Sequence, residues 1–128
     1  MTRLFKTRHF TRWMRKTDLS DELLYAAVGE MERGLIDADL GGGGVVKKRI
    51  AYQGRDKRGS SRILIATNKN DRWFFVFGFD KNERDNINST ELKALQTLAS
   101  DLLDFSETEL ESEIKNNTLQ EIYYDTKA

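Results

Sequence analysis

The fold is decided by residues 45–79, which read VVKKRIAYQGRDKRGSSRILIATNKNDRWFFVFGF. Three segments rich in β-branched and aromatic residues alternate here with polar connections, and this pattern predicts strands over 45–52, 60–68 and 72–79. The connections QGRDKRG and NKND are too short for a parallel crossover, so we expect sequential neighbours in an antiparallel sheet. The third strand is so rich in aromatic residues that we expect its burial on both faces.

Positive charge is concentrated in the same stretch. Seven basic residues fall within sixteen positions, against the single acid Asp56. They are Lys47, Lys48, Arg49, Arg55, Lys57, Arg58 and Arg62. Alternation along the first strand places Lys47 and Arg49 on one face and Lys48 on the opposite, apolar face. A cluster of this kind is typical of a surface that binds a polyanion such as RNA.

Length and composition set further limits. The chain has 128 residues, which fit one domain, and it has no cysteine, so disulfides and thiolate metal sites are excluded. No apolar run approaches the roughly 20 residues that span a bilayer, and the N-terminal segment lacks the hydrophobic region of a signal peptide. Residues 1–62 carry a net charge of +6 and residues 63–128 carry −6. We expect a cytoplasmic protein with no cofactor, no metal and no membrane association.

Two helices are predicted before the strands. The spacing of Phe10, Trp13 and Met14 favours a short helix, preceded by an edge strand at 3–6. Ser20 is a good N-cap for a second helix. The apolar face of that helix comprises Leu24, Ala27, Val28, Met31 and Leu35. The short connection between the two helices predicts a helical hairpin packed on the sheet.

Two further helices are predicted after the strands. Asn88 with Glu91, and Ser106 with Glu109, have the spacing of N-terminal capping boxes. The buried face of the first helix should comprise Leu92, Leu95, Leu98, Ala99, Leu102 and Leu103. The second helix is acidic and weakly apolar, and the tail TLQEIYYDTKA does not indicate whether it packs, pairs or stays loose. The fold class is therefore α+β, with a small antiparallel sheet, two N-terminal helices packed on it and C-terminal helices.

Two features invite a catalytic interpretation that the sequence does not support. The run GGGG (41–44) is followed by a strand, whereas a P-loop needs a Lys and a Ser/Thr that open a helix, so we interpret it as a flexible turn. His9 is the only histidine, but it lies in a basic segment with no carboxylate nearby in sequence. We interpret His9 as a partly exposed structural residue.

The segments KKRIAYQGRDKRGSSRILIA and WFFVFGFDKNERDNI resemble the RelE/HigB branch of toxin ribonucleases from bacterial type II toxin–antitoxin modules. The resemblance covers about residues 20–104, so we divide the chain into a RelE/HigB-like toxin domain (1–104) and an acidic C-terminal helical extension (105–128). It implies a RelE-like microbial ribonuclease-type fold and cleavage of messenger RNA on the ribosome. It also implies a cognate antitoxin, expected to be a small helix-turn-helix protein.

The resemblance implies site residues as well. Lys47, Arg49 and Arg62 would surround the scissile phosphate, with Lys81 and Arg84 beside them. The residues expected to contact the RNA backbone are Lys48, Arg55, Lys57 and Arg58. Cations on a rigid sheet suit this chemistry, because RNA supplies its own 2′-hydroxyl as nucleophile and needs alignment and charge stabilisation.

The chain departs from the family pattern after the aromatic strand. Some members carry a tyrosine or histidine there as acid or base, and this chain has Asp85–Asn88 instead. Three explanations are open: Glu83 replaces that residue, alignment alone accelerates cleavage, or the enzyme is weak or inactive. Two other classes of function also remain, a non-catalytic nucleic-acid-binding module and a protein-interaction domain.

Overall fold

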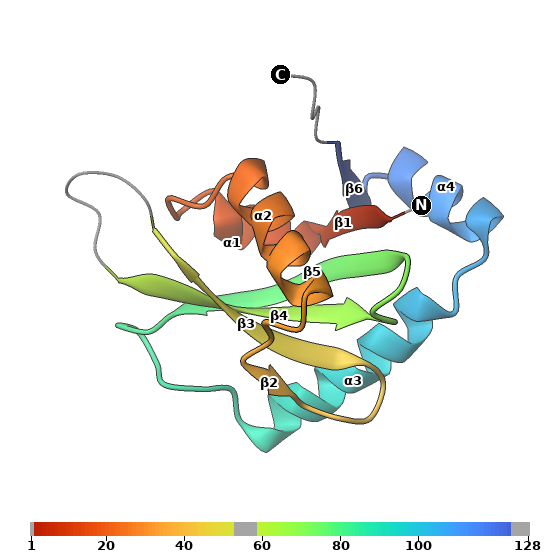
Figure 1. Ribbon diagram of the computed structural model, residues 1–128. Helices are drawn as coiled ribbons and strands as arrows, with labels where there is room; N and C mark the ends of the chain where they lie inside the picture. Colours follow the sequence, from red (N-terminus) through yellow and green to blue (C-terminus); the bar gives the residue numbers. More distant parts are fainter. Residues whose placement is uncertain (1, 53–58, 124–128) are drawn as a thin grey trace.

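A six-stranded sheet runs through the centre of the computed structural model, which describes residues 2–52 and 59–123 (Figure 1). The elements in chain order are β1 (Arg3–Thr7), α1 (Arg8–Met14), α2 (Asp21–Glu32), β2 (Ala38–Asp39), β3 (Val45–Ala51), β4 (Ser60–Thr67), β5 (Arg72–Asp80), α3 (Ser89–Leu103), α4 (Glu107–Lys115) and β6 (Leu119–Ile122). The strand order is β2-β3-β4-β5-β1-β6. The α+β class is confirmed, and so is the antiparallel series β3-β4-β5.

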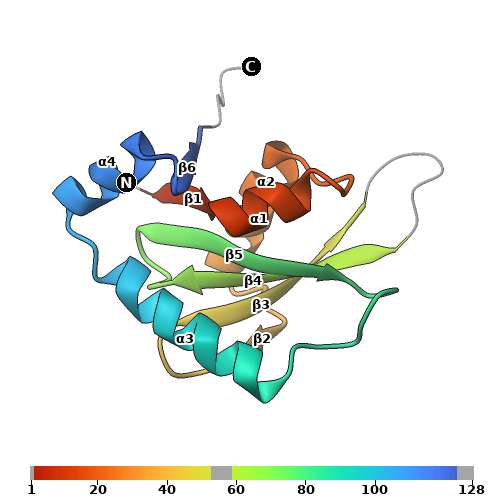
Figure 2. The same cartoon turned by 180° about the vertical axis from the view of Figure 1, so that it is seen from behind.

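Helices cover both faces of the sheet. The hairpin of α1 and α2 packs on one face, where Leu24, Val28 and Ile65 belong to a single buried cluster. α3 lies across the opposite face, as Figure 2 shows, and buries Leu95 and Leu102 in a second cluster together with α4. The predicted placement of the N-terminal helices on one face is therefore confirmed. Among the described helices, none is both long and apolar enough to cross a membrane.

β1 is an interior strand, so the prediction of an edge strand at 3–6 is wrong. It pairs parallel with β5 on one side and antiparallel with β6 on the other. The edge position is taken by β6, in which Leu119 and Ile122 are buried. The tail thus pairs with the sheet up to residue 122, and the division at residue 104 marks no gap in the packing.

A β-bulge at Val76 divides β5 into two halves. Leu64 of β4 pairs with Phe77, and the next residue, Ile65, pairs with Phe75, so Val76 has no partner in β4. The side chains on the two sides of the bulge therefore point differently. Phe75 packs toward the hairpin of α1 and α2, whereas Phe77 lies on the face of α3. The expected burial of this strand on both faces is confirmed.

Two predicted core residues are exposed. Leu35 is 54% exposed because α2 ends at Glu32 and Gly34 turns the chain with φ of +90°, which takes Leu35 out of the helical repeat. Leu98 is 37% exposed, since the buried stripe of α3 runs through Leu95, Ala99 and Leu102 and leaves Leu98 on its flank.

The glycine run at 41–44 is a packed turn. A Cβ on Gly43 would lie 2.6 Å from the carbonyl oxygen of Gln96 in α3, and a Cβ on Gly44 would lie 2.7 Å from that of Thr67 in β4. Both glycines also have positive φ, of 90° and 82°. Glycine is required here by close backbone approach, so the interpretation as a merely flexible turn was incomplete.

Gly78 provides a test of how α1 sits on β5. A Cβ at this position would lie 2.3 Å from Cζ3 of Trp13. Gly78→Ala should lower the free energy of unfolding by about 1–3 kcal/mol because the site is overpacked. The measurement is urea denaturation followed by circular dichroism.

The matched control for that experiment is Gly29→Ala in α2. The nearest atom to its added methyl is Nη1 of Arg33 at 3.7 Å, so nothing clashes. Alanine is favoured over glycine inside a helix, and this variant should gain up to about 1 kcal/mol. A Gly78→Ala protein as stable as the parent would contradict the described contact with Trp13.

Candidate functional site

A row of side chains crosses the sheet on the face opposite the α1–α2 hairpin. Arg49 pairs with Arg62, and Arg62 pairs with Phe79, so the three project from neighbouring positions of β3, β4 and β5. Arg84 extends the row, because its guanidinium carbon lies 5.6 Å from the centre of the Phe79 ring. Lys47 lies two residues before Arg49 and on the same face. The structure therefore brings four of the six predicted catalytic residues onto one surface, which we call the cationic face.

Ser60 holds two of these arginines together. Its Oγ accepts a hydrogen bond from Nε of Arg49 at 3.2 Å and another from Nη1 of Arg62 at 2.7 Å. Like charges directly opposite one another destabilise a strand pair, and a shared acceptor offsets part of that repulsion. A guanidinium has five N–H donors, so each arginine keeps several for a ligand. Within residues 2–52 and 59–123 neither guanidinium forms an ion pair, although the backbone N–H of Arg49 donates to the Asp37 carboxylate.

Arg84 is fixed by a different mechanism. Its guanidinium forms two parallel bonds with Glu91, and the Nη1 to Oε2 distance is 3.0 Å. Glu91 also accepts the backbone N–H of Asn88 at 2.9 Å and so completes the capping box of α3. These bonds, first from Arg84 and then from Asn88, lower the pKa of Glu91. Arg84 thus lies over Phe79 with its charge partly balanced.

A second row runs beside the first and ends at His9. Lys47 pairs with Leu64, and Leu64 pairs with Phe77. The imidazole of His9 stacks on Phe77, with ring centres 5.6 Å apart and planes 6° from parallel. Phe77 and Phe79 are themselves 6.5 Å apart, so the two rows are in contact along β5.

The position of His9 beside Phe77 could not be predicted from the sequence. It is exposed, as expected, but it lines a depression of about 320 Å³ together with Glu83 and Arg84. α1 reaches this place because β1 pairs parallel with the first half of β5 and the chain then turns into α1 alongside the second half. No sequence motif signals that long-range pairing.

The remaining predicted residues fall in three places. Lys81 and Glu83 are exposed on the turn after β5. Lys48 is only 7% exposed and lies on the hairpin face, where its Nζ is 2.8 Å from Oε1 of Glu30 and 2.9 Å from the carbonyl oxygen of Leu35. We therefore no longer assign Lys48 to RNA. The other residues expected to contact RNA lie outside the described part of the chain; they are Arg55, Lys57 and Arg58.

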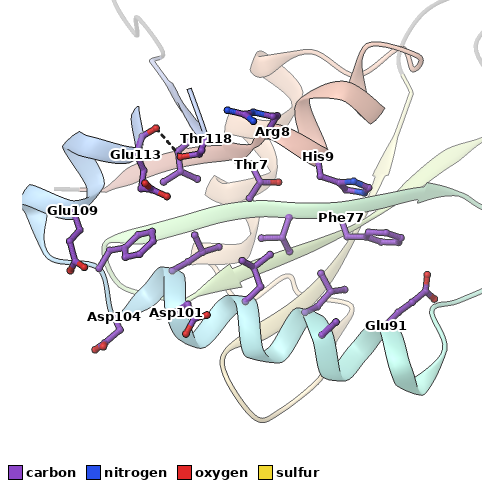
Figure 3. A pocket seen from close by; sticks show the side chains of 17 residues that line it. Thr7, Arg8, His9, Phe77, Glu91, Asp101, Asp104, Glu109, Glu113 and Thr118 are labelled. Carbon is purple, nitrogen blue, oxygen red and sulfur yellow. Dashed lines mark hydrogen bonds between the residues drawn. The ribbon is translucent and has the colours of Figure 1, made fainter. Parts of the chain in front are cut away.

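A groove of about 810 Å³ lies between α3, α4, β5 and the start of α1, and it differs from the cationic face in charge (Figure 3). Its apolar floor includes Phe77 and Leu98. Carboxylates surround that floor at Asp101, Asp104 and Glu109. The carboxylates repel phosphate from the part of the groove near α4, whereas Arg8 and His9 line its other side.

The acidic C-terminal part neutralises cations far from the cationic face. Arg3 forms ion pairs with Glu107 at 2.9 Å, Glu111 at 3.1 Å and Glu121 at 2.8 Å. Arg72 forms another with Glu107 at 3.0 Å. The opposite charges of the two halves of the chain therefore cancel around β1 and α4, whereas the side chains of Arg49 on β3 and Arg62 on β4 form no ion pair with any described carboxylate.

Comparison with known families agrees with this arrangement. A model of the RelE toxin of the RelE/RelB toxin–antitoxin system matches residues 2–122. The chain belongs to the RelE toxin family. The match includes β1, α4 and β6, so it extends beyond the resemblance noted over residues 20–104. Toxins of the RelE family are typically ribonucleases, and the RelE/RelB system implies a cognate antitoxin as partner. A comparison with curated proteins finds no match.

The bond between Glu91 and Arg84 predicts a specific pH dependence of stability. Because the pKa of Glu91 is lowered in the folded RelE-family chain, its contribution is complete above the unfolded value of about 4.3 and is lost as pH falls through the folded value. Glu91→Gln should therefore have a lower Tm at pH 7 and a smaller further decrease between about pH 5 and pH 3 than the parent.

Thermal melts by circular dichroism across that range measure the effect. Asp101→Asn is the control, because Asp101 lies on the same helix and has no ion pair among the described residues. It should keep the parental pH dependence. Parallel curves for the parent and Glu91→Gln would show that this bond does not form in solution.

Proposed function

We propose that this RelE-family toxin is a ribosome-dependent endoribonuclease that cuts messenger RNA and thereby halts translation in the cytoplasm. The observation that carries the proposal is the pair Arg49 and Arg62, held side by side on the Ser60 hydroxyl near the start of β4. Each guanidinium group can bind two oxygens of a phosphate through two parallel hydrogen bonds, so a fixed pair of them suits a phosphate ligand.

RNA cleavage by the 2′-hydroxyl requires no covalent intermediate with the protein. The 2′-oxygen of a nucleotide attacks the adjacent phosphorus, the bond to the 5′-oxygen breaks, and a 2′,3′-cyclic phosphate and a 5′-hydroxyl result. Negative charge grows on the non-bridging oxygens in the transition state, where fixed cations stabilise it most. Arg49 and Arg62 would bind these oxygens, and Lys47 would neutralise charge from the same strand.

The surrounding residues position the RNA strand. Arg84 is fixed by Glu91 over Phe79, and it would hold the phosphate next to the scissile one. Lys81 and Glu83 lie on the exposed turn beside it, where Lys81 can contact the backbone and Glu83 can share in proton transfer. The cognate antitoxin, which we expect to be a small helix-turn-helix protein, would keep this surface inactive until it is removed.

A non-catalytic nucleic-acid-binding module is the alternative that the same surface supports. Fixed cations bind a phosphate backbone whether or not cleavage follows, and no described tyrosine or histidine follows β5 in the segment 81–88. The two functions differ in one outcome. A ribonuclease creates new RNA 5′-ends at the ribosome, whereas a binding module leaves the message intact.

Induced expression tests the proposal, with Arg62→Ala as the informative variant. The parent should arrest growth and produce new 5′-ends within translated messages. Loss of one donor to a developing oxyanion costs about 100- to 1000-fold in rate. Arg62→Ala should therefore slow single-turnover cleavage of ribosome-bound message by that factor, with little change in ribosome binding.

Lys69→Ala serves as the control for Arg62→Ala, because Lys69 is an exposed cation at the opposite end of β4 and is paired with Asp39. It should cleave at the parental rate. Unchanged growth while the folded parent accumulates, with no new 5′-ends, would favour the binding module. Parental cleavage by Arg62→Ala would place the chemistry elsewhere.

Ser60 tests whether the spacing of the two arginines matters. Ser60→Ala removes the acceptor shared by Arg49 and Arg62 and should lower the single-turnover rate about 10-fold, because removing one neutral hydrogen-bond partner typically costs about 1 kcal/mol or somewhat more. Ser60→Thr keeps a hydroxyl and suits a strand, so it should retain most of the rate. Equal rates for the parent and both variants would show that the shared hydroxyl has no effect on cleavage.

A further inference from the structure

Contacts along β5 connect His9 to the cationic face. The imidazole stacks on Phe77 at 5.6 Å, Phe77 lies 6.5 Å from Phe79, and the guanidinium of Arg84 lies 5.6 Å from the Phe79 ring. Phe79 is also the strand partner of Arg62. His9 therefore stands at one end of a continuous series of contacts whose other members adjoin the proposed phosphate site.

One strand separates Arg62 from His9. Arg62 lies on β4 opposite Phe79 of β5, and neighbouring strands are about 4.8 Å apart. His9 stacks on Phe77, two residues before Phe79 on the same strand. A phosphate held by Arg62 would therefore lie next to the part of β5 on which His9 stacks.

Other side chains suited to proton transfer are worse placed. Tyr52 lies on the hairpin face, where its hydroxyl bonds Oδ1 of Asp80 at 2.6 Å and also contacts Ser61. Burial, and then the bond to Asp80, raises the pKa of Tyr52 to about 12. Glu83 shares the depression with His9 but lies on an exposed turn. Only His9 combines exposure, a fixed ring and a position on the proposed RNA-binding side among the described residues of these types.

We propose that His9, supplied by α1, is the general base of the cleavage reaction and takes the place of the acid–base residue that some family members carry after the sheet. The inference rests on the ribonuclease function proposed above. The neutral imidazole accepts the proton of the 2′-hydroxyl as the 2′-oxygen bonds to phosphorus. The electron pair of the breaking P–O bond goes to the 5′-oxygen, which takes a proton from water, and no oxidant or reductant is involved.

The charged groups around His9 favour an approaching RNA backbone. The depression is lined by cations, which are Arg12 on α1, Lys16 just after it and Arg84 after β5, and by one carboxylate, Glu83. The groove on the other side of His9 holds Arg8 and several carboxylates, of which Glu91 is bonded to Arg84; the others, Asp101, Asp104, Glu109 and Glu113, lie toward α4. The balance is positive within the depression, so an RNA backbone would approach His9 from that side.

The experiment compares two substitutions at His9 that separate stacking from proton transfer. His9→Phe keeps an aromatic ring on Phe77 but cannot accept a proton, and His9→Gln keeps polarity without a base. Both should lower the rate of single-turnover cleavage of ribosome-bound message by about 100-fold or more. Ribosome binding, measured in parallel, should stay within about twofold of the parent for a residue that acts in the chemical step.

Two further readouts would not respond to a purely structural role. The parental rate should rise with pH within the range where histidine side chains lose their proton, about pH 5 to 8, and His9→Gln should lose this dependence. His9→Gly should regain cleavage when free imidazole is added, since it leaves the face of Phe77 open. Lys69→Ala, which removes a cation far from His9 that is paired with Asp39, should keep both the parental rate and its pH dependence.

The outcomes separate this inference from the function on which it rests. If the parent produces no new RNA 5′-ends, the ribonuclease function fails and the role of His9 fails with it. If the parent cleaves and His9→Phe cleaves equally fast, His9 only stacks, and the base assignment is overturned alone. A parental rate that falls as pH rises through the same range would also overturn it, because a base must lose its proton to act.

Discussion

The bulge at Val76 is the constraint on which the site depends. Phe75, Phe77 and Phe79 alternate in sequence, and a regular strand would place all three on the hairpin face. Because Val76 is an extra residue opposite β4, Phe77 and Phe79 turn to the other face, beside Arg62. The aromatic strand thus supports the α1–α2 hairpin with its first half and the cationic face with its second half.

That arrangement also explains which parts could be predicted from sequence. The alternation of apolar and polar residues and the short connections were enough to predict β3, β4 and β5 as antiparallel neighbours. The same alternation correctly placed Lys47 and Arg49 on one face and Lys48 on the other. The alternation of side chains between the two faces breaks at a bulge, and no residue in β5 indicates from sequence that a bulge is present. The parallel pairing of β1 joins segments that are far apart in sequence, so neither its interior position nor the location of His9 followed from local patterns.

The cations discussed above have different environments. Lys48 and Arg3 are paired with carboxylates, Arg84 is shared between Glu91 and the Phe79 ring, and the Arg49 and Arg62 side chains share a neutral hydroxyl and have no ion pair among the described residues. A neutral acceptor fixes geometry without cancelling charge. The surface most able to attract RNA is thus small, even though basic residues occur throughout the first half of the chain.

The pairing of β1 with β6 has a consequence for how the chain folds. Leu4 and Ile122 are partners in this ladder, although they come from opposite ends of the described chain. Closing so large a loop carries a high entropic penalty, and contacts of this kind form late. Until β6 pairs, β1 presents an unsatisfied strand edge. Before β6 pairs, the free edge of β1 can pair with a strand of a second copy of the chain. Pairing of β6 with β1 therefore also protects against misassembly.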